Sequence, residues 1–126
     1  MKNKKKKDIA AMNTIVRNCL IEIARKMKTI RYQELSDMCN LGLSMSNPGH
    51  RSKIAKILCE ISEFEHRNNR PLLSAVVASK EGPGDGFYNL ADKLKLCSAK
   101  DKNRLMFWKK EVEKVYDCWS KSNSRL

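Results

Sequence analysis

The sequence predicts a single, mainly α-helical domain of the α+β type. Apolar residues recur every three or four positions in three long segments, a spacing that places them on one face of a helix. One short apolar run, residues 72–78, precedes a glycine-rich segment, which indicates a buried strand and a tight turn. With 126 residues, of which 41% are hydrophobic, the chain can form one core and has little left for a second domain.

The first helix is expected to begin at Asp8, a residue type that often caps helices, and to end near residue 27. Residues 1–7 hold five lysines and are expected to form a disordered basic tail, because such a run cannot pack. Residues 122–126 are expected to fray, which leaves 8–121 as the domain. The apolar face of the first helix comprises Ile9, Met12, Val16, Cys19, Leu20, Ile23 and Met27.

A short extended link is expected at residues 29–32, followed by a short helix over about 32–38 with Leu35 and Met38 inward. Residues 40–49 are rich in Asn, Ser, Gly and Pro and therefore predict a loop. Three apolar residues would hold this loop against the core: Leu41, Leu43 and Met45.

The clearest predicted element is a helix over about 49–68. The expected strand at 72–78 follows it, and residues 80–86 then predict a turn or a wing, because they contain three glycines and a proline. The apolar stripe of the 49–68 helix comprises Ile54, Ile57, Leu58, Ile61 and Phe64.

Residues 87–96 are expected to form a short strand that passes into a helix. Ser98 and Asp101 resemble a capping box, which predicts a final helix over about 99–121. The apolar stripe of that helix comprises Leu105, Trp108, Val112, Val115 and Trp119.

The charge balance points to a polyanionic partner. The chain has 26 basic and 14 acidic residues, a net charge of +12, and removing the five tail lysines leaves 21 against 14, or +7. Such a field attracts nucleic acid first, and acidic membrane or acidic protein less strongly. Charge runs are nevertheless often only a solvated surface, so a basic face without a partner is the plain alternative.

Several classes of function are not expected. The five cysteines form no CxxC pair and the chain has two histidines, so neither a zinc site nor a disulfide framework is predicted, and the cysteines are expected to be small, reduced core residues. The glycine-rich turn lacks a Gly-Lys-Ser/Thr ending and is not expected to open directly into a helix, which argues against a nucleotide site. We therefore expect no enzyme activity, cofactor or metal. The absence of a signal peptide or membrane-length apolar run predicts a cytoplasmic protein without a membrane partner.

The order of a short helix, a loop, a basic helix, a strand and a glycine-rich wing is that of a winged helix-turn-helix core, here with an additional C-terminal helix. In that arrangement the second helix enters a groove and the wing holds phosphates. The candidate contacts are His50, Arg51, Ser52, Lys53 and Lys56 on the helix, Lys80 on the wing, and Lys4, Lys5, Lys6 and Lys7 as a non-specific anchor.

Parts of residues 29–60 and 70–77 resemble the C-terminal DNA-binding domain of O6-alkylguanine-DNA alkyltransferases and of the non-catalytic alkyltransferase-like proteins. The matching stretches are Tyr32-Gln-Glu-Leu35-Ser, Asn47-Pro48, Lys53-Ile54-Ala55 and Arg70-Pro71-Leu-Leu-Ser-Ala-Val-Val77. The resemblance implies a winged-helix fold that binds duplex DNA. The basic charge alone leaves RNA open as the less favoured ligand.

The departures from that family decide the chemistry that we expect. The family's reactive Pro-Cys-His-Arg is Pro71-Leu72-Leu73-Ser74 here, so alkyl transfer by that mechanism is not available. Ser52 takes the place of the arginine that the family inserts into the base stack, which puts base flipping in doubt. Tyr32 matches the family's phosphate-contacting tyrosine, and the resemblance gives it that role.

A second hypothesis is a small regulatory or phage-encoded module that docks its basic surface on an acidic protein partner. If the stripe with Trp108 and Trp119 were exposed, it would mark a partner surface or a homodimer seam on the C-terminal helix instead of core packing.

Overall fold

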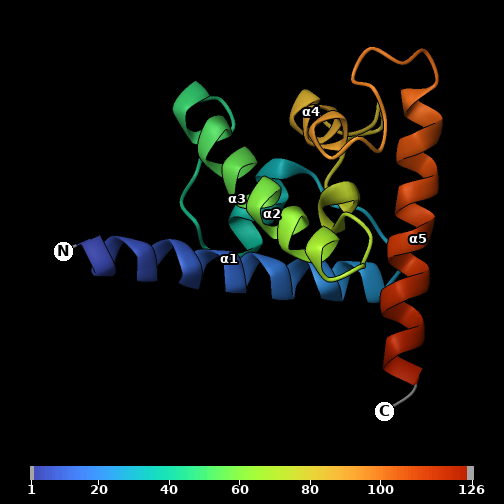
Figure 1. The fold of residues 1–126 in the computed structure, drawn as a ribbon. Coiled ribbons are helices and arrows are strands. Elements are labelled where there is room, and N and C mark those ends of the chain that lie inside the picture. The colour runs from blue at the N-terminus through green and yellow to red at the C-terminus, as the bar shows by residue number, and fades with distance from the viewer. Residues whose placement is uncertain (1, 125–126) are drawn as a thin grey trace.

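The computed structural model describes the backbone of residues 2–124 and the side chains of residues 12–120. In that part, the chain forms five α-helices and one short 3-10 helix and has no extended strand, so the mainly α prediction is confirmed (Figure 1). The elements are α1 (Lys2–Arg25), α2 (Tyr32–Met38), α3 (Pro48–Arg67), η1 (Leu73–Val76), α4 (Asp85–Lys93) and α5 (Arg104–Ser124).

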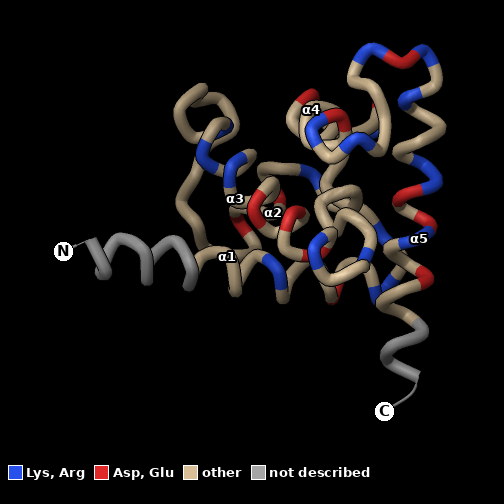
Figure 2. Tube along the Cα trace, in the orientation of Figure 1, with Lys and Arg blue, Asp and Glu red and all other residues tan. Residues whose placement is uncertain are grey.

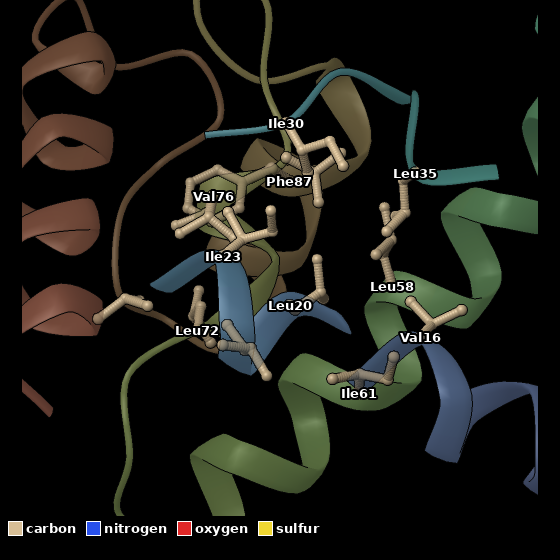
Figure 3. Packing of buried hydrophobic residues seen from close by; sticks show 14 of the residues in the cluster. Val16, Leu20, Ile23, Ile30, Leu35, Leu58, Ile61, Leu72, Val76 and Phe87 are labelled. Atoms are coloured by element: carbon tan, nitrogen blue, oxygen red, sulfur yellow. The ribbon is translucent and has the colours of Figure 1, made fainter. Parts of the chain in front are cut away.

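The 3-10 helix η1 is the centre of the fold. It packs against α1, α3 and α5, while α4 packs against α3 and α2 against α1. Figure 1 shows α1 along one side of the molecule, α5 standing across its C-terminal end, and the start of α3, α4 and the loop before α5 on the side away from α1. Figure 3 shows the core at this junction, where Val16 and Leu20 of α1 lie near Leu58 and Ile61 of α3.

The helix bounds largely follow the sequence. The short helix was expected at 32–38 and is found there, and α3 begins one residue before its expected start at 49. The backbone of α1 is helical from Lys2, six residues before Asp8, whereas the side chains of the lysine tail lie outside the described residues. The last helix begins at Arg104 and not near 99, because Ser98 and Asp101 cap local turns and accept from the amides of Lys100 and Asn103.

The predicted strand at 72–78 is wrong, although its burial is confirmed. Residues 73–76 form η1, and only Val77 makes a parallel bridge, with Ile30 of the extended link. Three of the backbone groups in this segment are bonded to side chains and not to a neighbouring strand. Glu111 accepts from the amide of Leu72 at 2.8 Å, Ser62 accepts from the amide of Ser74 at 3.0 Å, and Trp108 donates to the carbonyl of Ala75 at 2.8 Å.

The predicted wing hairpin and the predicted strand at residue 87 are also wrong. The described chain makes one antiparallel bridge, between Ser79 and Gly82, and then enters α4 directly with Gly84 at its N-cap. Gly82 has a φ of +114°, which a residue with a side chain rarely adopts. The turn therefore does lead into a helix. The expectation that it would not was one of the two arguments against a nucleotide site, and that argument no longer applies. The missing Gly-Lys-Ser/Thr ending and Asp85 in the first turn of α4 still argue against one.

Four apolar residues that were expected to face inward are exposed. Met27, Met38, Phe64 and Leu105 keep 60%, 57%, 43% and 43% of their surface accessible. The expected packing of the 40–49 loop is confirmed, because Leu43 is buried and Leu41 and Met45 pack against the core.

Candidate nucleic-acid interface

The start of α3 is held by its own sequence. The side-chain oxygen of Asn47 accepts from the amides of Gly49 at 2.8 Å and His50 at 3.3 Å, and Pro48 occupies the first turn, where its missing N–H costs nothing. This cap fixes the position at which the basic residues of α3 begin.

Lys53 and Lys56 form the clearest cationic feature of α3. Both side chains are exposed, and neither makes a hydrogen bond or ion pair with a described residue. Their spacing of three residues puts them on one face of the helix, and the exposed Ser52 lies beside them. Two free ammonium groups on neighbouring turns can contact neighbouring phosphates.

Arg51 and His50 face the preceding loop as well as solvent. The Arg51 guanidinium donates from Nη1 to the carbonyl of Met45 at 3.0 Å. His50 accepts at Nδ1 from the amide of Ser44 at 2.9 Å, so in its neutral form it carries the proton on Nε2. The loop therefore orients both side chains at the beginning of the basic face.

Tyr32 connects this region to the glycine-rich turn. Its hydroxyl accepts from the amide of Gly84 at 3.0 Å and keeps its own proton to donate. Burial raises the pKa of Tyr32. Lys80 is exposed in the turn at residues 79–82, and no hydrogen bond or ion pair joins it to α3. The structure thus gathers His50, Arg51, Ser52, Lys53 and Lys56 on one helix start and leaves Lys80 on another element.

A cavity of about 310 Å³ lies between α3 and α4, and the sequence did not predict it. Arg51 and Asp85 contribute the charged part of its lining. The space exists because small residues face each other, and a Cβ on Gly86 would lie 3.9 Å from that of Ala55. This glycine and alanine were the only features of the sequence that could have indicated the cavity. The lining comprises Tyr32, Met45, Arg51, Ile54, Ala55, Leu58, Cys59, Ser74, Gly84, Asp85, Gly86, Phe87 and Leu90.

Further basic residues lie on the same side of the molecule as the start of α3. Figure 2 shows Lys and Arg positions at the first turns of α3, in α4 and in the loop before α5, all away from α1. Lys93 forms an ion pair with Glu63 at 3.0 Å, whereas Lys95, Lys100 and Lys102 are exposed. The sequence-based site contained none of these four lysines, because they are distant from α3 along the chain.

Two findings concern other kinds of site. No helix in the described part of the chain is both long and apolar enough to cross a membrane. Among the same residues, no three His, Cys, Asp or Glu side chains lie close enough together to hold a metal ion.

Comparisons with known proteins give no relative. No family model matches the chain, and no curated protein or solved structure matches it either. The resemblance to alkyltransferase DNA-binding domains therefore stays a prediction from the short motifs around Tyr32, Asn47 and Arg70.

Proposed function

We propose that the protein binds duplex DNA, without catalysis, through the N-terminal half of α3. The observation that carries the proposal is the pair of exposed, unpaired lysines, Lys53 and Lys56, on one face of a capped helix start. Arg51 extends the cationic surface toward the cavity, and the positive end of the helix dipole adds to it. Lys80 and the lysine tail supply further phosphate contacts in this proposal.

The tryptophans favour a duplex over a single strand. Proteins that hold single strands stack bases on exposed aromatic rings. Trp108 and Trp119 are half-buried, and Trp108 donates its indole proton to the carbonyl of Ala75. Phe64 is exposed, and the guanidinium groups of Arg17 and Arg70 lie over its ring, at 5.4 and 5.7 Å from the ring centre. No free aromatic platform is therefore offered by the described side chains.

The thiol in the cavity supports binding without alkyl transfer. Cys59 lines the cavity beside α4, and burial raises the pKa of its thiol, with Glu63 adding to the effect. A protonated thiol is a poor nucleophile. The positions where the resembled family carries its cysteine and histidine are Leu72 and Leu73, and both side chains are completely buried here.

The proposal is tested by equilibrium titration against duplex DNA, single-stranded DNA and duplex RNA at low salt. The variant K53Q/K56Q is compared with K109Q/K110Q, which removes the same charge from exposed positions on α5. We expect duplex DNA to bind best, and K53Q/K56Q to weaken it roughly tenfold while K109Q/K110Q changes it by about twofold or less. No duplex binding at low salt, or equal losses in the two variants, would overturn the proposal.

A further inference from the structure

Two of the five cysteines meet where α1 packs against the end of α2. The Sγ of Cys39 donates a hydrogen bond to the Sγ of Cys19, with 2.9 Å between the two sulfurs. Cys19 lies on α1 and is half-buried, whereas Cys39 is the C-cap of α2 and is buried. Their sulfurs need to approach by only about 0.9 Å to reach the length of a disulfide bond.

The other three cysteines differ from this pair. Cys59, Cys97 and Cys118 are half-buried, and none has another sulfur within hydrogen-bond distance in the described structure. They are therefore internal references for the reactivity of an isolated thiol in the same protein.

We propose that Cys19 and Cys39 are a modification site, at which hydrogen peroxide converts the two thiols into a disulfide that a thiol reductant reverses. The sulfur of Cys19 attacks one peroxide oxygen, so that an S–O bond forms, the O–O bond breaks and water leaves. The sulfur of Cys39 then attacks that sulfur, an S–S bond forms, the S–O bond breaks and a second water leaves. The two waters take up both thiol protons, and the peroxide accepts the two electrons that the sulfurs lose.

The environment assigns the two steps to different residues. Cys19 is the more accessible residue of the pair and accepts the hydrogen bond of Cys39, so it is the one that the oxidant reaches first. Burial and the contact with Cys19 raise the pKa of Cys39 to about 12, which makes Cys39 the poorer nucleophile for the first step. Its sulfur lies 2.9 Å from that of Cys19, so Cys39 is placed to attack Cys19 once Cys19 is oxidised.

The disulfide would join two elements that otherwise meet only by packing. It would tie α1 to the C-cap of α2, directly before the loop whose Ser44 and Met45 hold His50 and Arg51. Closing this short loop of chain is expected to raise the melting temperature by roughly 5–10 °C. The proposal does not depend on what α3 binds.

The test is treatment of the reduced, full-length protein with hydrogen peroxide, followed by thiol counting, intact mass and tryptic mapping without reductant. We expect the free thiols to fall from five to three, the mass to fall by about 2 Da, and peptides 18–25 and 32–51 to be linked. A thiol reductant should restore five thiols, and the Cys59→Ser control should form the same link.

The Cys19→Ser variant should form no such link and should show no rise in melting temperature on oxidation. Because Cys39 is buried, Cys19→Ser is the milder of the two substitutions for folding. The proposal is overturned if wild type keeps five thiols, if Cys19 stops at a sulfenic or higher oxide without a link, or if the link joins other cysteines.

Discussion

The best-defined ionic contact of the core is centred on Glu65 of α3. Its side chain is completely buried and is bound by Arg17 Nε at 2.6 Å and Arg70 Nε at 2.5 Å. Both guanidinium groups also lie within 6 Å of the rings of Phe64 and Trp119. The arginines are partly exposed and the carboxylate is not, so water can reach the positive charges of this cluster but not the negative one.

Removing the arginines should therefore cost more than removing the charge of Glu65. R17M/R70M leaves a buried carboxylate without a cation, a loss of about 3–5 kcal/mol in the free energy of unfolding. E65Q leaves two arginines that water can still hydrate, so it should lower the free energy of unfolding by only about 1–3 kcal/mol. Urea unfolding of the two variants measures the difference, and a larger loss for E65Q would contradict this description of the cluster.

At the scale of single elements, the cap of α3 is the feature most open to a direct test. Asn47→Ala removes the acceptor of the Gly49 and His50 amides and should lower the free energy of unfolding by about 1 kcal/mol. Asn89→Ala is the matched control, because Asn89 is exposed on α4 and lacks a cap role. Urea unfolding should separate the two variants, and equal stability would show that the cap contributes nothing.

The elements that the sequence predicted well are those fixed by neighbouring residues. Asn47 and Pro48 mark the start of α3, and the apolar stripe through Ile54, Ile57 and Ile61 fixes its buried face. Residues 73–76 were mistaken for a strand because their apolar run indicates burial but not backbone geometry. Their partners, Ser62 and Glu111, are far away in the sequence and satisfy the backbone in a way that no local pattern shows.

The candidate interface was predictable to a similar extent. Lys53 and Lys56 were expected on the exposed face of α3, and they lie there unpaired. The cavity beside Arg51 was missed because it depends on the packing of α4 against α3. The lysines near α5 were missed for the same reason, since only the three-dimensional fold brings them to that side of the molecule.

At the scale of the whole molecule, buried acids make the fold sensitive to alkali. Burial raises the pKa of several groups that ordinarily titrate near 9 or 10, and Cys39 is raised to about 12. The unfolded chain loses this proton near pH 9 while the folded chain keeps it, so the stabilisation is present below pH 9 and is lost as the pH rises toward 12. The other groups that shift in the same direction are Tyr32, Cys59, Tyr88, Cys97, Tyr116 and Cys118.

Between pH 8.5 and pH 10.5, the free energy of unfolding should therefore fall more in wild type than in Cys39→Ala, because only wild type has the buried Cys39 thiol. Urea midpoints of both proteins at the two pH values, with a reductant present, give the comparison. An equal fall in the two proteins would mean that the Cys39 thiol is not the group responsible.

The salt dependence of duplex binding tests the central claim most directly. Each lysine that contacts a phosphate contributes about 0.9 to the slope of log affinity against log salt concentration. If Lys53 and Lys56 both contact phosphates, K53Q/K56Q should lower the magnitude of that slope by about 1.8, and K109Q/K110Q should leave it unchanged. Identical slopes for wild type and K53Q/K56Q would show that this face of α3 does not meet the nucleic acid.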